Sequence, residues 1–229
     1  MTIKVNYILT RSKRKTVALY IRNGGLEVRA PLKVSKHDID RFVVSKENWI
    51  KDRLTRSKEQ LTRRENFSLD YGDLITYRGK QYPVAEKICN GLGFDGKQFY
   101  ISPGLQPEQI KAACIQIYRT LAKHDLTEKT LNFAKKMSVV PSVVKINGAK
   151  TRWGSCSSKR SLNFSWRLIM AEEEVIDYVI VHELAHILEM NHSEQFWAIV
   201  EKVLPDYRKR KAKLKQLHQK LSEENWDLP

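Results

Sequence analysis

The feature that most constrains this 229-residue chain is a pair of histidines four positions apart, with an acid beside the first. The motif is His182-Glu183-Leu184-Ala185-His186, and it follows an apolar stretch that is typical of a buried helix. On a helix, residues four apart project from one face, so both imidazoles can bind one zinc ion. Glu183 is then placed to accept a proton from water on the metal. The pattern predicts a catalytic metal site on a helix.

A third histidine, His192, follows six residues after the motif and can complete the ligand set if the chain turns back. Ser193 is a suitable N-cap for a second helix, which would hold His192 between two ordered elements. Three neutral imidazoles leave one tetrahedral position open, as in catalytic rather than structural zinc sites. Glu194 and Glu201 are alternative third ligands.

The chain carries 41 Lys and Arg against 26 Asp and Glu, a formal net charge of +15. Such a charge can attract nucleic acid or a polyphosphate, or it can be a solvated surface. The basic residues are spread along the chain from Arg11–Lys15 to Arg208–Lys215, and this spread favours the solvated surface. An acidic ligand stays open as an alternative.

Cysteine usage and hydropathy bear on the compartment. Cys89, Cys114 and Cys156 are widely spaced and form no Cys-x-x-Cys pair, which disfavours a disulfide framework or a zinc ribbon. Residues 1–5 lack the apolar core of a secretory signal, and no run approaches the ~18 apolar residues of a membrane span. We therefore expect a cytoplasmic protein without a membrane partner.

Hydrophobic periodicity predicts an α+β fold in two parts. Residues 1–104 form a β-rich module with a helical insert that begins at Ser35, and Ser102-Pro103-Gly104 marks a boundary. In this module an alternating strand begins at Ile3, and Asn23-Gly24-Gly25 is expected to form the turn of a hairpin. Residues 105–229 form a second domain that contains the histidine motif and opens with a helix from Pro107, whose apolar stripe includes Cys114. Within it, residues 150–156 and 162–168 are expected to form a hairpin leading into the histidine helix, which starts near Glu173.

Three residues near the motif are candidates for substrate contact. Arg152 can bind an anionic group or an oxyanion, Trp153 can stack on a substrate, and Tyr207 can stabilise an oxyanion. Each also has a purely structural interpretation, with Arg152 as a surface cation and Trp153 as a core residue. Cys156, which could approach the metal, is equally typical of a buried thiol.

Four segments together carry a family resemblance: Trp153–Cys156, Leu162–Leu168, Ile176–His186 and Asn191–Trp197. They resemble the YgjP-like metallopeptidase family, which is related to the SprT-like and WLM zincins. The likeness is dense from about Lys150 to Tyr207 and looser around residues 11–16 and 28–31.

The resemblance implies that residues 105–229 form a zincin-like, metal-dependent hydrolase domain with a small gluzincin-like catalytic core. By that resemblance His182, His186 and His192 are the metal ligands and Glu183 is the base. The spacing of the histidines also matches metzincins, but Glu189 stands where metzincins have glycine, and no Met-turn can be identified.

The leading functional prediction is a zinc-dependent hydrolase, a metallopeptidase in which Glu183 activates a zinc-bound water. Nickel, copper or iron would also suit three histidines. One alternative keeps the site but hydrolyses the phosphoanhydride bond of a nucleoside triphosphate, as a pyrophosphatase does, and the net charge and Arg152 would suit that substrate. Another is a nucleic-acid-associated protein of the SprT-like type, recruited through its basic surface.

Overall fold

The computed structural model describes residues 6–88 and 91–227, which divide into two compact units. Unit 1 comprises residues 1–67 and 222–225, and unit 2 comprises residues 68–221 and 226–229. The division thus falls after Phe67, whereas the sequence placed a boundary at residue 104. The physical reason is that strand residue Phe99 packs against Tyr118 of the following long helix, with ring centroids 5.2 Å apart.

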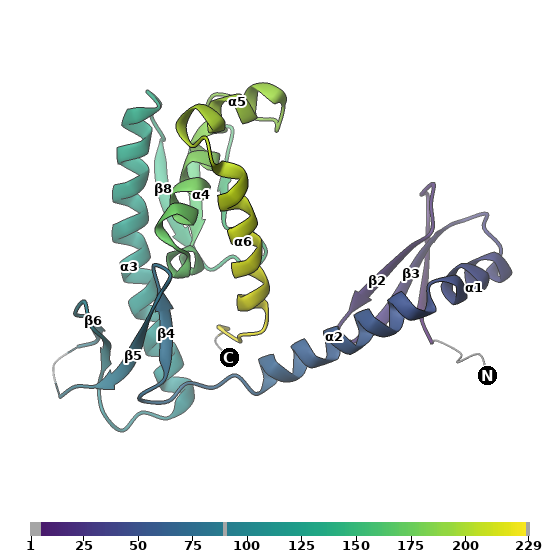
Figure 1. Ribbon diagram of the computed structural model, residues 1–229, viewed down its shortest axis with the longest axis horizontal. Helices are drawn as coiled ribbons and strands as arrows, with labels where there is room; N and C mark the ends of the chain where they lie inside the picture. The colour runs from purple at the N-terminus through teal and green to yellow at the C-terminus, as the bar shows by residue number, and fades with distance from the viewer. Residues whose placement is uncertain (1–5, 89–90, 228–229) are drawn as a thin grey trace. The chain divides into compact units, whose positions relative to one another are not determined.

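Unit 1 is a three-stranded sheet covered by two helices (Figure 1). Its strands are β1 (Ile8–Ser12), β2 (Ala18–Arg22) and β3 (Gly25–Pro31), in the order β1-β3-β2. The predicted hairpin between β2 and β3 is confirmed. Its turn residues Asn23 and Gly24 have φ angles of 49° and 71°, the left-handed pair that a tight two-residue hairpin requires. The predicted first strand began at Ile3, and residues 1–5 lie outside the described part of the chain.

The helices of unit 1 are α1 (Lys36–Ser45) and α2 (Glu47–Glu65). The predicted start of α1 is confirmed, because Ser35 accepts a hydrogen bond from the backbone N–H of Asp38 at 3.0 Å. Lys46 separates the two helices, ending one and beginning the next. One face of the helices and one face of the sheet share a core of Leu26, Val28, Ala30, Ile39, Val43 and Ile50.

Unit 2 contains two further sheets. One has the order β4-β5-β7-β6 and is built from β4 (Leu74–Tyr77), β5 (Lys80–Glu86), β6 (Gly93–Phe94) and β7 (Phe99–Ile101). The other has the order β8-β10-β9 and is built from β8 (Val143–Asn147), β9 (Gly154–Cys156) and β10 (Ser161–Ser165). The predicted hairpin is confirmed as the antiparallel β9–β10 pair, although β10 ends earlier and continues as a 3₁₀ helix, η1 (Trp166–Met170).

The helices of unit 2 are α3 (Pro107–Lys136), α4 (Glu173–Ala185), α5 (Glu194–Val203) and α6 (Tyr207–Ser222). Helix α3 runs beside β8 and α4 in Figure 1 and contacts both, so it connects the β8-β10-β9 sheet with the helix that carries the histidine motif. Cys114 lies on its buried face, as expected from the apolar stripe. Together the sheets and helices confirm the predicted α+β class.

A buried arginine ties two distant segments of unit 2 together. Arg167 on η1 donates hydrogen bonds to the carbonyl of Gly148 at 3.0 Å and to the carbonyl of Trp226 at 3.0 Å. Asp227 accepts from Arg167 at 3.1 Å and pairs with Lys150 at 2.7 Å. These contacts hold the segment Trp226–Asp227 against the loop that leads into β9.

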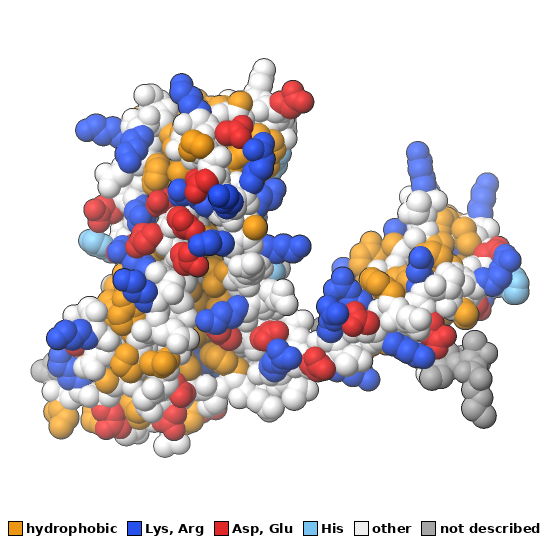
Figure 2. Space-filling model, in the orientation of Figure 1, with side chains coloured by type: hydrophobic (Ala, Val, Ile, Leu, Met, Phe, Trp, Pro, Cys, Tyr) orange, Lys and Arg blue, Asp and Glu red, His pale blue; other side chains and the backbone are white. Residues whose placement is uncertain are grey.

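The basic charge is distributed. Figure 2 shows Lys and Arg side chains scattered over the visible face of each unit, interspersed with Asp and Glu. Within the described part of the chain, no helix combines the length and the hydropathy that crossing a bilayer requires.

Candidate metal centre

Helix α4 delivers the first two histidines and the acid. Its residues are mostly buried, which agrees with the apolar sequence that precedes the motif. His182 lies in the last turn of α4, and His186 caps the helix immediately after it. The two imidazole rings project to the same side, with centroids 4.9 Å apart. The predicted one-face arrangement of the pair is thus present in the structure.

His192 comes from the turn between α4 and α5. Ser193 caps α5 as predicted, accepting a hydrogen bond from the N–H of Phe196 at 3.3 Å. The Nε2 atoms of His192 and His182 are 3.1 Å apart, and the His192 and His186 rings are separated by 4.7 Å. All three histidines have a possible ligand nitrogen within 4.8 Å of the others.

The two alternative third ligands are not part of this group. The metal-capable cluster found among the described residues contains only the three histidines, and the carboxylate of Glu201 instead accepts a hydrogen bond from Arg208 at 2.8 Å. Exposure rises from buried His186 through half-buried His182 to exposed His192, so solvent reaches the cluster from the His192 side.

The protonation of these rings suits a divalent metal. The Nδ1–H of His186 donates to the carbonyl of Glu189 at 3.2 Å, which leaves its Nε2 lone pair free. His182 Nδ1 is buried and has no hydrogen-bond partner in the described structure. Burial and the neighbouring histidines lower the pKa of His182 to about 3, and burial also lowers the pKa of His186. Two nitrogens on a tetrahedral ion at roughly 2.1 Å would lie roughly 3.4 Å apart, close to the observed Nε2 separation.

Aromatic rings enclose the cluster. Trp197 stacks on His192 with centroids 5.8 Å apart, and Phe196 lies 4.5 Å from His186. Tyr207 stacks on Trp197 at 5.2 Å, which places this predicted substrate-contact residue one ring away from His192. The rings restrict the rotamers of the histidines and lower the local dielectric constant.

Glu183 is buried against strand β9. A Cβ atom built on Gly154 would lie 2.6 Å from both Cγ and Oε1 of Glu183, so the acid occupies the space that any larger residue would need. Burial raises the pKa of Glu183 to about 7, and the positive charge of Arg152 acts in the opposite direction. The acid therefore lies against the edge of the sheet, next to the first histidine.

The other predicted residues are located around Glu183. Arg152 is exposed and lies two residues before Gly154 in the loop leading into β9. Trp153 is half-buried, and its ring meets His218 of α6 edge-on at 6.1 Å. Cys156 is half-buried at the end of β9 and is absent from the metal-capable group, while its pKa is raised by burial and by Glu183.

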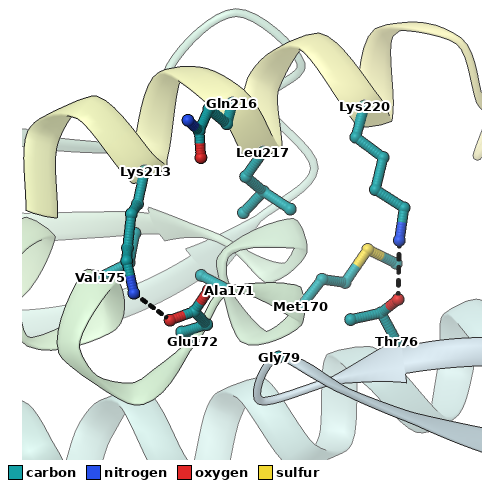
Figure 3. A pocket seen from close by; sticks show the side chains of 10 residues that line it. All are labelled: Thr76, Gly79, Met170, Ala171, Glu172, Val175, Lys213, Gln216, Leu217 and Lys220. Carbon is teal, nitrogen blue, oxygen red and sulfur yellow. Dashed lines mark hydrogen bonds and ion pairs between the residues drawn. The ribbon is translucent and has the colours of Figure 1, made fainter.

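A separate cavity of about 350 Å³ lies between α6, the start of α4 and the β4–β5 hairpin (Figure 3). It shares no lining residue with the histidine cluster. Lys213 reaches across its edge to Glu172 at 2.7 Å, and Lys220 donates to Thr76 at 3.2 Å. Lys213 also pairs with Glu174 at 2.5 Å, so these contacts fix α6 relative to α4.

Sequence reasoning missed three residues at the centre. Gly154 was part of the Trp153–Cys156 run, but a glycine inside a strand shows only that something approaches closely. Trp197 was only the last residue of the Asn191–Trp197 segment, and nothing in the sequence shows that its ring lies against His192. Lys211 of α6 looked like one basic residue among many, yet its ammonium lies 4.7 Å from the centroid of the Trp197 ring.

Two solved structures are similar to part of the chain. The metallopeptidase zymogen abylysin of Pyrococcus abyssi is 27% identical, with a TM-score of 0.38, and the match covers 43% of this chain and 97% of that chain. The metallopeptidase zymogen jannalysin of Methanocaldococcus jannaschii is 21% identical, with a TM-score of 0.37, and the match covers 40% of this chain and 95% of that chain. No curated protein matches the chain.

The family comparison spans far more of the sequence. The family described as YgjP-like, metallopeptidase domain, matches residues 15–217, which leaves out only the first 14 and last 12 residues. The match includes every residue of the histidine cluster, Glu183 and the strand against which the acid packs. The protein therefore belongs to the YgjP-like family of metallopeptidases, metal-dependent enzymes that hydrolyse peptide bonds.

Proposed function

We propose that this protein is a zinc-dependent peptidase in which His182, His186 and His192 hold the ion and Glu183 is the general base. The observation that carries the proposal is the convergence of three imidazoles beside a buried carboxyl group. When bound there, the metal supplies Lewis acidity, which lowers the pKa of water and polarises a carbonyl group. The hydrogen bond from His186 Nδ1 to the backbone carbonyl of Glu189 keeps that proposed ligand in the required tautomer.

The proton transfers are assigned to Glu183. Its carboxylate accepts the proton that the attacking water loses, and the resulting carboxylic acid then donates that proton to the departing amine. Its place against Gly154 restricts the side chain to a narrow range of rotamers, so the carboxylate is oriented before substrate arrives. Preorganisation of this kind lowers the entropic cost of reaching the transition state.

Strand β9 is the proposed docking site for the peptide. It lies at the edge of its sheet and pairs with β10 on one side only, so its other side offers backbone groups to an extended substrate. Arg152 and Trp153 immediately precede this strand and are proposed to contact the substrate. Tyr207, which stacks on Trp197, is proposed to stabilise the oxyanion.

The test compares the wild-type protein, loaded with one equivalent of Zn²⁺, with Glu183→Gln. Cleavage of a mixed peptide library and hydrolysis of nucleoside triphosphates are measured in parallel, together with bound metal. Loss of a general base costs about 10²- to 10⁴-fold in rate, so Glu183→Gln should retain zinc and lose peptide cleavage by that factor. Glu128→Gln, an exposed acid on α3, is the matched control.

Two outcomes would overturn the proposal. One is nucleotide hydrolysis that depends on Glu183 while no peptide is cleaved, which would assign the site to phosphoanhydride chemistry. The other is a wild-type protein that binds no divalent transition metal and is unchanged by His186→Ala.

A further inference from the structure

One cation of α6 stands apart from its neighbours. The Nζ atom of Lys211 lies 4.7 Å from the centroid of the Trp197 ring. That ring is 5.8 Å from the His182 ring and 5.8 Å from the His192 ring, so the ammonium is one aromatic residue away from two of the proposed ligands. Its charge also contributes to the lowered pKa of His182.

Lys211 is exposed and has no carboxylate partner in the described structure. Three nearby basic residues of α6 do have such partners: Arg208 with Glu201 at 2.8 Å, Arg210 with Asp206 at 2.8 Å and Lys213 with Glu172 at 2.7 Å. The last of these pairs, drawn in Figure 3, anchors the helix that carries Lys211. An ammonium held over a tryptophan beside the site is thus left available for another anion.

A second available cation comes from a different element. Arg152 is exposed, has no ion-pair partner among the residues described, and lies in the loop that leads into β9. It is two residues from Gly154, the residue in contact with Glu183. Lys211 on α6 therefore adds a positive charge beside two of the proposed ligands, and Arg152 in the β9 loop adds a second one whose field acts on Glu183.

We infer that Lys211 and Arg152 select peptides that carry an acidic side chain next to the scissile bond. The inference rests on the proposed peptidase function and specifies its substrate class. A carboxylate at this centre gains a point charge where it meets the ammonium, or a two-pronged hydrogen-bond donor where it meets the guanidinium. The positive field of Lys211 and Arg152 also favours the approach of a peptide that carries a negative charge.

The experiment uses two peptides that differ by a single Glu-to-Gln exchange beside the cleaved bond. With the zinc-loaded wild-type protein at low salt, kcat/KM should be about tenfold higher for the Glu peptide, since each partly exposed ion pair is worth up to about fivefold. Lys211→Met should reduce this preference by about threefold and leave cleavage of the Gln peptide unchanged. Arg152→Met should also reduce the preference by about threefold, measured as the ratio of kcat/KM for the two peptides, because Arg152 is itself proposed to contact the substrate. Lys211→Arg should retain the preference, which separates charge from folding.

A matched control and a binding measurement complete the test. Lys209→Met removes an exposed cation two residues away, roughly on the opposite side of the helix, and should not alter the preference. Calorimetry of both peptides binding to the zinc-loaded Glu183→Gln variant should show the same preference for the Glu peptide. This preference should weaken as the salt concentration rises.

Equal cleavage and equal binding of the two peptides by the wild-type protein would overturn the inference while leaving the peptidase intact. A preference that survives in the double variant Lys211→Met/Arg152→Met would overturn it as well. Failure to cleave any peptide would instead contradict the proposed function.

Discussion

Gly154→Ala tests whether the backbone of β9 sets the position of Glu183, the proposed general base. The added Cβ would lie 2.6 Å from Glu183 Cγ and 2.8 Å from its Cδ. Because non-bonded carbon atoms prefer a separation of roughly 3.5 Å or more, the two groups would overlap by roughly 1 Å. The backbone of Gly154 is not left-handed, so alanine introduces a steric conflict without a conformational one.

The side chain of Glu183 is the part most able to move. Gly154 pairs with fully buried Phe164 in the antiparallel register of β9 and β10, and α4 is buried along most of its length. Overpacking of this kind costs about 1–3 kcal/mol in unfolding free energy. A displacement of about 1 Å at a catalytic group costs about 100-fold in rate, so kcat/KM should fall by at least that factor.

The assay measures peptide cleavage, zinc content and urea denaturation of the same preparations. Gly148→Ala is the matched control, because a Cβ there meets Arg119 at 3.5 Å and Trp166 at 3.7 Å, which are ordinary contact distances. We expect Gly148→Ala to keep its activity and Gly154→Ala to keep its zinc but not its activity. A folded Gly154→Ala protein with kcat/KM within about threefold of wild type would refute the steric argument.

Three other predictions follow from the described geometry. His186→Ala should weaken zinc binding by more than about 100-fold, since loss of a residue that only hydrogen-bonds to a ligand already costs about 10- to 100-fold. Competition with a chelator measures the affinity, and an unchanged value would remove His186 from the ligand set. Burial raises the pKa of Cys114 to about 12, so at pH 8.5 only roughly one thiol in 3,000 is ionised and the folded protein should resist alkylation there. Mass spectrometry after brief iodoacetamide treatment should show Cys114 modified only once urea is added, or in the folded protein when the pH approaches the thiol pKa. Rapid modification of the folded protein at pH 8.5 would show that Cys114 is accessible. Trp226→Ala should lower the unfolding free energy by about 3–5 kcal/mol, because the ring is buried 5.5 Å from Tyr118. A urea titration showing a loss below about 1 kcal/mol would mean that the C-terminal segment is not anchored.

Local patterns explain what could be predicted of the site. The spacing of His182 and His186 determines a shared helix face, and Ser193 determines where the next helix starts, so short-range geometry places three histidines together. The capped start of α1 and the Asn23-Gly24 hairpin follow from local backbone preferences in the same way. These features depend on residues that are only a few positions apart.

The remaining features depend on contacts between distant segments. The parallel pairing of β1 with β3 and of β8 with β10 is set by packing rather than by any turn signal. Gly154 meets Glu183 only because β9 lies against α4, and Lys211 reaches Trp197 only because Lys213 fixes α6. The sequence predicted helices at the positions of α1, α3, α4 and α5, but not α6, and it could not determine which polar residues face the histidines.

The Arg167 contacts have a practical consequence for anyone preparing this protein. Trp226 and Asp227 are held by Arg167, which also holds Gly148, and Asp227 pairs with Lys150 in the loop leading to Arg152. We expect an affinity tag fused directly after Asp227 to disturb these contacts and so to displace the loop that carries the proposed substrate contacts. Tags belong at the other terminus, and a preparation tagged at the C-terminus that shows weak activity should be compared with one from which the tag has been removed.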